Sequence, residues 1–177
     1  MKLIILDRDG VINYDSASYI KSPEEWKPIP GSLEAIALLN QAGYQVVIAT
    51  NQSGVGRGLF EMATLNAIHD KMHRALGVVG GRVDAIFFCP HAQDAGCNCR
   101  KPKPGLFEEI ARRFKVSLKD VPSIGDALRD LEVSAAVGAQ PILVLTGKGI
   151  KTRDEDKLPA GTRVFADLAE AAKAIIQ

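Results

Sequence analysis

Short apolar runs alternate with helical segments along this chain, and that alternation is the feature that most limits its fold. The apolar runs predict strands over residues 3–6, 44–49, 83–88, 121–124 and 141–145. Apolar residues at helical spacing predict helices over residues 32–41, 61–76, 106–114, 131–137 and 167–176. We expect residues 146–162 to form a loop. Strands that alternate with helices are typical of an α/β fold, in which helices cover both faces of a parallel sheet.

The length and composition of the chain suit one globular domain, which we expect to span residues 1–177. The formal net charge of +1 offers no broad positive field for nucleic acid or for an anionic membrane. No apolar run approaches the roughly 18 residues of a membrane span, and the first run ends at Asp7, which argues against a signal peptide. We therefore expect a cytoplasmic protein that acts on a small molecule. No long apolar stripe favours a dimer, so we expect a monomer.

Polar side chains follow several of the expected strands at the point where each strand ends. Asp7 and Asp9 follow the first strand, Thr50 and Asn51 follow the second, and Asp126 follows the fourth. Because the carboxyl ends of parallel strands share one edge of the sheet, we expect these residues to converge. Two acids two residues apart at such an edge suit Mg²⁺. Taken alone, the first pair also fits a turn without a bound ion, since Asp and Gly are common turn residues.

This convergence suits the hydrolysis of a phosphate monoester, where catalysis is mainly positioning and charge neutralisation. Asp7 can attack phosphorus and form an aspartyl phosphate, and Asp9 can serve as general acid and base. Thr50 offers a hydroxyl to the phosphoryl oxygens, and Lys101 offers a fixed positive charge. Magnesium can be held by Asp7, Asp9 and Asp126.

The order and spacing of these residues resemble a known family. Asp7-x-Asp9, Thr50, Lys101 and Gly125-Asp126-x-x-x-Asp130 resemble the four motifs of the haloacid dehalogenase superfamily. The resemblance covers the whole chain and implies a Rossmann-like domain. It also implies that Asp7 is the nucleophile, that Asp9 is the acid and base, and that Mg²⁺ lies on Asp7, the Asp9 carbonyl and Asp126.

Many members of that superfamily carry a large cap domain between the motifs, and this chain has no room for one. Residues 11–49 hold one loop and one helix–strand unit, and residues 51–100 hold one helix, one strand and a cysteine-rich loop. We therefore expect a capless domain with an open site that admits bulky phosphoesters.

A second group of potential metal ligands lies in a short loop over residues 89–99. Thiol and imidazole ligands of this kind suit tetrahedral Zn²⁺ in a structural site, formed by Cys89, His91, Cys97 and Cys99. Arg100 and Lys101 follow directly, so zinc would fix where their charges point. The alternative is a set of free cysteines beside an incidental histidine.

Further residues narrow the resemblance to the branch of histidinol-phosphate and heptose-bisphosphate phosphatases. Asn13, Ser53 and the Gly54-x-x-Arg57-Gly58 turn are similar to the heptose-bisphosphate pattern. That pattern implies cleavage of a heptose 1,7-bisphosphate at the 7-phosphate, in the supply of ADP-heptose for lipopolysaccharide core. The substrate contacts that it implies are Gly10, Asp15, Tyr19, Asn51, Gln52, Ser53, Arg57 and Arg100.

Alternative functions stay open at this point. Only residues 92–96 separate His91 from Cys97, a short loop more typical of histidinol-phosphate phosphatases, and Ala127 stands where heptose phosphatases usually have lysine. A phosphotransferase, or a zinc-stabilised phosphate-binding module without turnover, would share many of the same residues.

Two groups of charged or titratable residues outside the motifs have simpler interpretations. His69 and His73 lie four residues apart on an expected helix, and without a third ligand nearby we expect an exposed or half-buried helix face. Lys148, Lys151 and Arg153 form a basic cluster that we expect to be a solvated loop.

Overall fold

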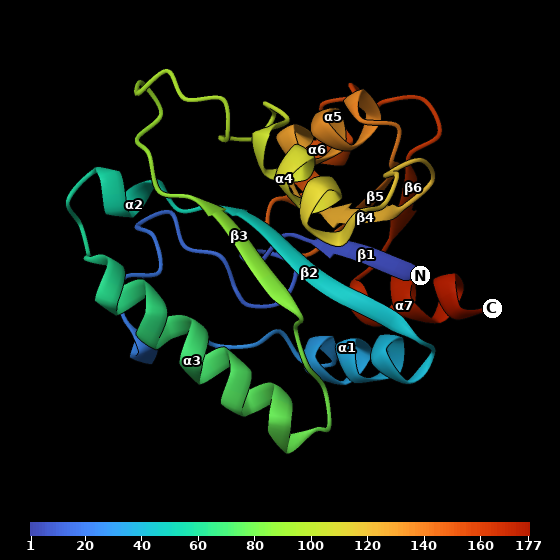
Figure 1. Cartoon of the computed structure of the whole chain (residues 1–177), viewed down its shortest axis with the longest axis horizontal. Helices are drawn as coiled ribbons and strands as arrows, with labels where there is room; N and C mark the ends of the chain where they lie inside the picture. The colour runs from blue at the N-terminus through green and yellow to red at the C-terminus, as the bar shows by residue number, and fades with distance from the viewer.

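A parallel sheet lies at the centre of the fold (Figure 1). The computed structural model describes residues 1–177. In chain order the strands are β1 (Lys2–Leu6), β2 (Tyr44–Asn51), β3 (Ala85–Cys89), β4 (Pro122–Gly125), β5 (Gln140–Val144) and β6 (Arg163–Phe165). They form a 6-stranded sheet in the order β3-β2-β1-β4-β5-β6, and every pairing is parallel. The predicted parallel α/β fold is confirmed.

Helices cover both faces of this sheet (Figure 1). One face carries α1 (Ser32–Gln41), α3 (Met62–Val78) and α7 (Leu168–Ile176), and the other carries α4 (Gly105–Phe114) and α5 (Leu128–Ala136). The short elements are a 3₁₀ turn η1 (Pro23–Glu25), α2 (Ser53–Gly56) and α6 (Gly149–Asp154). None of the helices combines the length and the apolar character needed to cross a membrane.

The first strand divides the core into two clusters, because successive side chains of a strand point to opposite faces. Ile4 and Leu6 pack in a cluster of 22 buried residues with α1, α3 and α7. Leu3 and Ile5 pack in a cluster of 10 buried residues with α4. β1 is therefore buried on both faces, as its unbroken apolar run predicts.

The prediction of a loop over residues 146–162 is wrong, because α6 lies within it. This helix is too short to show a helical period, and tertiary contacts place it. The Thr152 hydroxyl donates to the Asp126 carbonyl at 2.8 Å, and the Lys148 N–H donates to Asp126 Oδ2 at 2.9 Å. The sequence also missed β6, which has only three residues and forms by pairing with β5.

The irregular segment after β1 is anchored by one aromatic side chain. Trp26 is fully buried, and the Lys71 ammonium on α3 donates to the carbonyls of Pro23 at 2.6 Å and Trp26 at 2.8 Å. This anchoring holds the segment beside the carboxyl ends of the strands, where residues 15–17 and Tyr19 line a cavity.

Candidate active site

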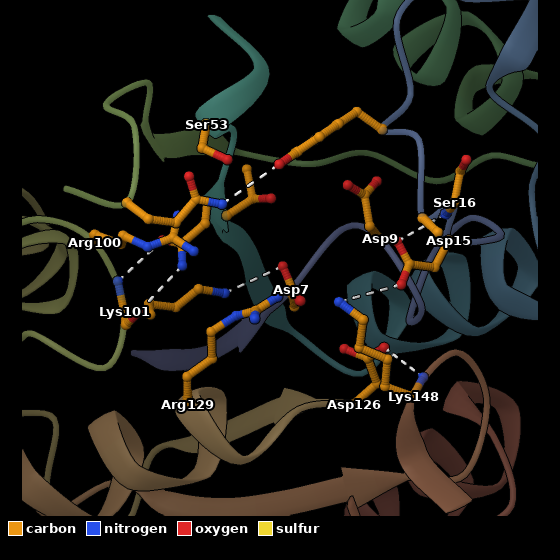
Figure 2. Close-up of a pocket in the computed structure, with 15 residues that line it drawn as sticks. Asp7, Asp9, Asp15, Ser16, Ser53, Arg100, Lys101, Asp126, Arg129 and Lys148 are labelled. Atoms are coloured by element: carbon orange, nitrogen blue, oxygen red, sulfur yellow. Dashed lines mark hydrogen bonds and ion pairs between the residues drawn. The ribbon is translucent and has the colours of Figure 1, made fainter. Parts of the chain in front are cut away.

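A polar cavity of about 170 Å³ opens at the carboxyl edge of the sheet, where β1, β2 and β4 end (Figure 2). Its lining is formed by Asp7, Asp9, Asp15, Ser16, Ala17, Tyr19, Thr50, Asn51, Ser53, Gln93, Arg100, Lys101, Asp126, Arg129 and Lys148. The polar residues expected at the strand ends therefore lie around one space. Only two of the lining residues are hydrophobic, so the cavity suits a charged, hydrophilic ligand.

Lys101 lies deep in this cavity and joins three elements of the fold. Its ammonium lies 3.2 Å from Asp7 Oδ1 (Figure 2). It also donates to Asp130 Oδ1 at 2.7 Å and to the Ala49 carbonyl at 2.6 Å. The side chain is 2% exposed. Burial acts to lower its pKa, but the charges of Asp130 and Asp7 raise that pKa above its usual range, so the ammonium stays charged.

Asn51 fixes the backbone that carries Lys101. Its side-chain oxygen accepts from the Lys101 N–H at 3.0 Å, and its side-chain N–H donates to the Lys101 carbonyl at 3.2 Å. The neighbouring Thr50 hydroxyl is buried and accepts from the Gln52 side chain at 3.0 Å. The end of β2 thus places the Thr50 hydroxyl at the cavity and, through Asn51, fixes the backbone of Lys101.

Asp7 and Asp126 are buried carboxylates whose pKa values are raised, first by burial and then by neighbouring carboxylates. Burial, followed by the charge of Asp130, raises the pKa of Asp7 from 3.8 to about 6. Burial, followed by the charges of Asp7 and Asp130, raises the pKa of Asp126 from 3.8 to about 8. One carboxylate oxygen from each of these three residues lies within 4.8 Å of the others, so the group could hold a metal ion. Lys101 lies closer to Asp130, at 2.7 Å, than to Asp7, at 3.2 Å, which favours Asp7 and Asp126 as the metal ligands.

The Asp126 carboxylate lies so close to the backbone at position 10 that only glycine fits there. Gly10 has φ +84°, and a Cβ atom built there would lie 2.0 Å from Asp126 Oδ2. Any side chain would therefore displace the Asp126 carboxylate. Gly10 shapes the site in this way without lining the cavity.

Asp9 is held by several donors that favour its ionised form. Asn13 Nδ2 donates to Asp9 Oδ1 at 2.9 Å, and Gln52 Nε2 donates to Asp9 Oδ2 at 3.4 Å. Burial acts to raise the pKa of Asp9, but the charge of Arg8 and these hydrogen bonds hold that pKa below its usual range. Gln52 therefore contacts both Thr50 and Asp9 from behind the cavity.

Arg57 lies outside the cavity lining, next to residues that form its wall. Its Nε donates to Gln93 Oε1 at 2.8 Å, and its guanidinium lies 6.0 Å from the Tyr19 ring centroid. Tyr19 and Gln93 both line the cavity. Tyr19 has φ 67°, a strained conformation for a tyrosine, and such strain is frequent at functional sites.

Two cations of the cavity were missed or misread from the sequence. Arg129 of α5 points toward Asp7 and Lys101 (Figure 2), and its Nε is buried without a hydrogen-bond partner. Its place between Asp126 and Asp130 in the fourth motif was the available signal. Lys148, expected in a solvated loop, lines the cavity, with its ammonium 3.6 Å from Asp15 Oδ2 (Figure 2).

The cysteine and histidine side chains of residues 89–99 form a second compact group. Cys89 Sγ lies 3.0 Å from Cys99 Sγ, 3.6 Å from Cys97 Sγ and 3.4 Å from His91 Nδ1, and His91 Nδ1 lies 3.3 Å from Cys99 Sγ. Burial acts to raise the pKa of Cys97, but hydrogen bonds, chiefly from the backbone of Arg100, lower it to about 6. The four side chains could hold one metal ion.

Comparisons with known proteins agree with these observations. A family model described as HAD-hydrolase-like matches residues 98–171. The chain is 62% identical over 177 residues to D-glycero-beta-D-manno-heptose-1,7-bisphosphate 7-phosphatase of Bordetella bronchiseptica, covering 100% of this chain and 99% of that protein. The Pseudomonas putida protein of the same name is 53% identical over 176 residues, covering 99% of this chain and 100% of that protein.

Solved structures extend the similarity to the fold. The crystal structure of D,D-heptose 1,7-bisphosphate phosphatase from B. bronchiseptica, complexed with magnesium and phosphate, matches with a TM-score of 0.99 at 62% identity and covers 100% of this chain and 99% of that one. The Burkholderia thailandensis phosphatase structure matches with a TM-score of 0.81 at 54% identity and covers 100% of this chain and 99% of that one.

Proposed function

The chain belongs to the haloacid dehalogenase-like hydrolases, in the heptose-bisphosphate phosphatase family, and on that premise we propose that it removes the 7-phosphate of D-glycero-D-manno-heptose 1,7-bisphosphate. The observation that carries the proposal is the grouping of Asp7, Asp9, Thr50, Lys101 and Asp126 around one polar cavity. The names of the relatives support the choice of sugar. We place the reaction in the supply of ADP-heptose for lipopolysaccharide core.

Asp7 is the nucleophile in this proposal. Its carboxylate oxygen attacks phosphorus, and the bond between phosphorus and the sugar oxygen breaks as the aspartyl phosphate forms. Lys101, 3.2 Å from Asp7 Oδ1, holds that carboxylate in place and neutralises charge on the phosphoryl oxygens. The Thr50 hydroxyl donates to one of those oxygens.

Asp9 moves the protons of the reaction. It gives a proton to the leaving sugar oxygen, then takes a proton from the water that attacks the aspartyl phosphate, and inorganic phosphate departs. The dianionic phosphate of the substrate brings negative charge beside Asp9, which acts to raise the pKa of Asp9 toward the value that an acid needs.

The residues of the cavity fit a magnesium ion. Asp7 and Asp126 provide oxygen ligands with unbalanced negative charge, and the family resemblance adds the Asp9 carbonyl. When bound, the ion would neutralise charge on the transferring phosphoryl group. Burial and the neighbouring carboxylates raise the pKa values of Asp7 and Asp126, and a cation bound there would favour their ionised forms.

The cysteine and histidine group fits a structural zinc ion. Three sulfur ligands and one ring nitrogen lie close enough to share one ion, and such a full set of four leaves no position for a substrate. Zinc bound there would hold the chain just before Arg100 and Lys101, which both line the cavity.

Two arginines of the cavity suit the phosphate groups of a sugar bisphosphate. Arg100 and Arg129 both line the cavity, and both have a buried guanidinium nitrogen without a hydrogen-bond partner. Such unpaired N–H groups are costly unless an anion accepts from them. Arg guanidinium groups also match phosphate geometry.

The test compares phosphate release with Mg²⁺ from heptose 1,7-bisphosphate and from histidinol phosphate, each as kcat/KM. Histidinol phosphate is the second candidate, because residues 92–96 form the shorter loop of that branch. We expect a strong preference for the heptose. A preference for histidinol phosphate, or activity that survives in Asp7→Asn, would overturn the proposal.

A further inference from the structure

The side chain between the two catalytic aspartates turns away from the cavity and is completely buried. Arg8 is 0% exposed. Its Nε and Nη2 both lie 2.8 Å from Asp9 Oδ1. A buried guanidinium is costly unless its donors are paired, and Asp9 accepts a hydrogen bond from Nε and forms an ion pair with Nη2, which has no hydrogen-bond partner of its own. The remaining edge faces α3.

His69 of α3 meets that remaining edge. Arg8 Nη1 lies 3.0 Å from His69 Nε2, and His69 is 7% exposed, which corrects the expectation of an exposed or half-buried side chain. Arginine can only donate hydrogen bonds, so His69 Nε2 must accept. The imidazole is therefore neutral and carries its proton on Nδ1. Burial, followed by the charge of Arg8, lowers the pKa of His69 from 6.5 to about 3, which agrees with this state.

The contacts of Asp9 distinguish its two oxygens. Oδ1 accepts from Arg8 and from Asn13 at 2.9 Å, whereas Oδ2 has only the longer contact with Gln52 at 3.4 Å. Oδ2 is therefore the oxygen that is free to exchange a proton. The guanidinium plane of Arg8 determines this orientation, and that plane is fixed only if both of its edges have partners.

We propose that His69 is a positioning residue for the proton transfer: it accepts from Arg8, and through Arg8 it orients the Asp9 carboxylate toward the leaving oxygen of the substrate. The inference rests on the proposed function, since it assigns Asp9 the role of acid. His69 does not line the cavity and does not touch the substrate.

Two substrates whose leaving groups differ in their need for a proton can show whether Asp9 is poorly oriented. A sugar alkoxide must gain a proton as it leaves, whereas p-nitrophenolate leaves as an anion without one. The ratio kcat/KM reports the steps up to the first irreversible one, here the departure of the leaving group. Poor orientation of Asp9 should therefore lower kcat/KM for the sugar phosphate and largely spare kcat/KM for p-nitrophenyl phosphate.

The experiment measures both ratios in wild type, His69→Leu and His69→Gln, with His73→Leu as the matched control. His73 lies one helical turn away and is exposed. We expect His69→Leu to lower kcat/KM for heptose 1,7-bisphosphate by about 10- to 100-fold, the size of effect that a misplaced catalytic group has. For p-nitrophenyl phosphate we expect a loss below about threefold. His69→Gln places an amide oxygen near the Nε2 position and should restore most of the lost activity, and His73→Leu should match wild type.

Two results would overturn the inference. A loss of the same size on both substrates would mean that residue 69 only maintains the fold, and an unchanged kcat/KM for the heptose would mean that Asp9 needs no such support. If His69→Leu fails to fold, His69→Asn replaces it, because its shorter amide cannot reach the Nε2 position while Gln can. Failure of the proposed function is a separate result: wild type would then not hydrolyse the heptose, and the same comparison would use another sugar phosphate that it does hydrolyse.

Discussion

Lys101 connects two groups of potential metal ligands, and the two groups differ in how the chain brings their members together. The acidic group combines Asp7, Asp126 and Asp130, which are all buried and come from distant parts of the chain. The cysteine group (Cys89, His91, Cys97 and Cys99) comes from one short segment, and only Cys89 is buried.

The difference concerns what holds each group together. The sheet assembles the acidic group, so its geometry exists before any ion binds, at the cost of charge repulsion among the carboxylates. In the cysteine group, Cys89 belongs to the smaller core cluster and Cys97 and Cys99 pack against it, whereas His91 and residues 93–96 are exposed, so a bound ion would provide order for that exposed part. Lys101 joins the two, because its backbone follows the cysteine segment and its ammonium contacts Asp7 and Asp130.

The largest effect should come from the acidic group. Asp7→Asn should lower kcat by at least about 10⁴-fold, because the amide cannot attack phosphorus. The thermal midpoint should stay the same or rise, since the mutation removes a charge that Asp130 and burial disfavour. Phosphate release and thermal melts measure both effects. Asp70→Asn, at an exposed carboxylate of α3 outside the cavity lining, is the control and should keep the activity.

The second effect tests the link between the groups. Lys101→Met should lower kcat by about 10²- to 10³-fold, the value of one well-placed charge at a transition state. It should also destabilise the fold by about 3 kcal/mol, since it breaks a buried ion pair and leaves Asp130 uncompensated. Denaturant unfolding and kinetics measure these changes. A stable, fully active variant would show that the two groups are independent.

The third effect tests the cysteine group alone. Cys97→Ser should reduce bound zinc and lower kcat/KM by about 10-fold, because the ion would orient the cations that follow it and act only indirectly. Metal analysis and kinetics provide the measurement, with Asn98→Ser as the exposed, non-ligand control. Zinc-free protein with wild-type activity would remove the structural role.

The last effect concerns stability rather than turnover, and it is the pH dependence of the acidic group without magnesium. The pKa of Asp126 is about 8 in the folded state and near 3.8 when unfolded, so between these values only the folded state holds the proton. The free energy of unfolding contributed by Asp126 therefore falls as pH rises, by at most about 1.4 kcal/mol per pH unit.

Denaturant unfolding of magnesium-free, zinc-retaining protein at pH 5 and pH 8 measures this contribution against Asp126→Asn, which lacks it. We expect the pH-dependent loss of stability to be larger in wild type, and added Mg²⁺ to reduce it. Equal pH dependence in the two proteins would contradict the assignment of Asp126 as an unbalanced ligand.

Sequence patterns predicted the structure best where all the residues that form a feature lie close together along the chain. The apolar run over residues 3–6 and the potential metal ligands over residues 89–99 are local, and both could be recognised without the fold. The helix α6 and the strand β6 could not, because each is short and forms through contacts with distant residues. Lys148 was misread for the same reason, since the Asp126 carboxylate holds the Lys148 N–H at the cavity.

The sequence by itself determined the alternation of strands and helices, the polar residues at strand ends and the cysteine group, because periodicity and residue chemistry are properties of neighbouring residues. Only the tertiary structure decided that Arg129 and Lys148 enter the cavity and that Arg8 and His69 lie behind Asp9. Those contacts depend on the order of strands in the sheet and on the packing of α3 and α5 against it. Side-chain directions across such packed elements are set by burial and hydrogen-bond pairing in three dimensions, which spacing along the chain does not encode.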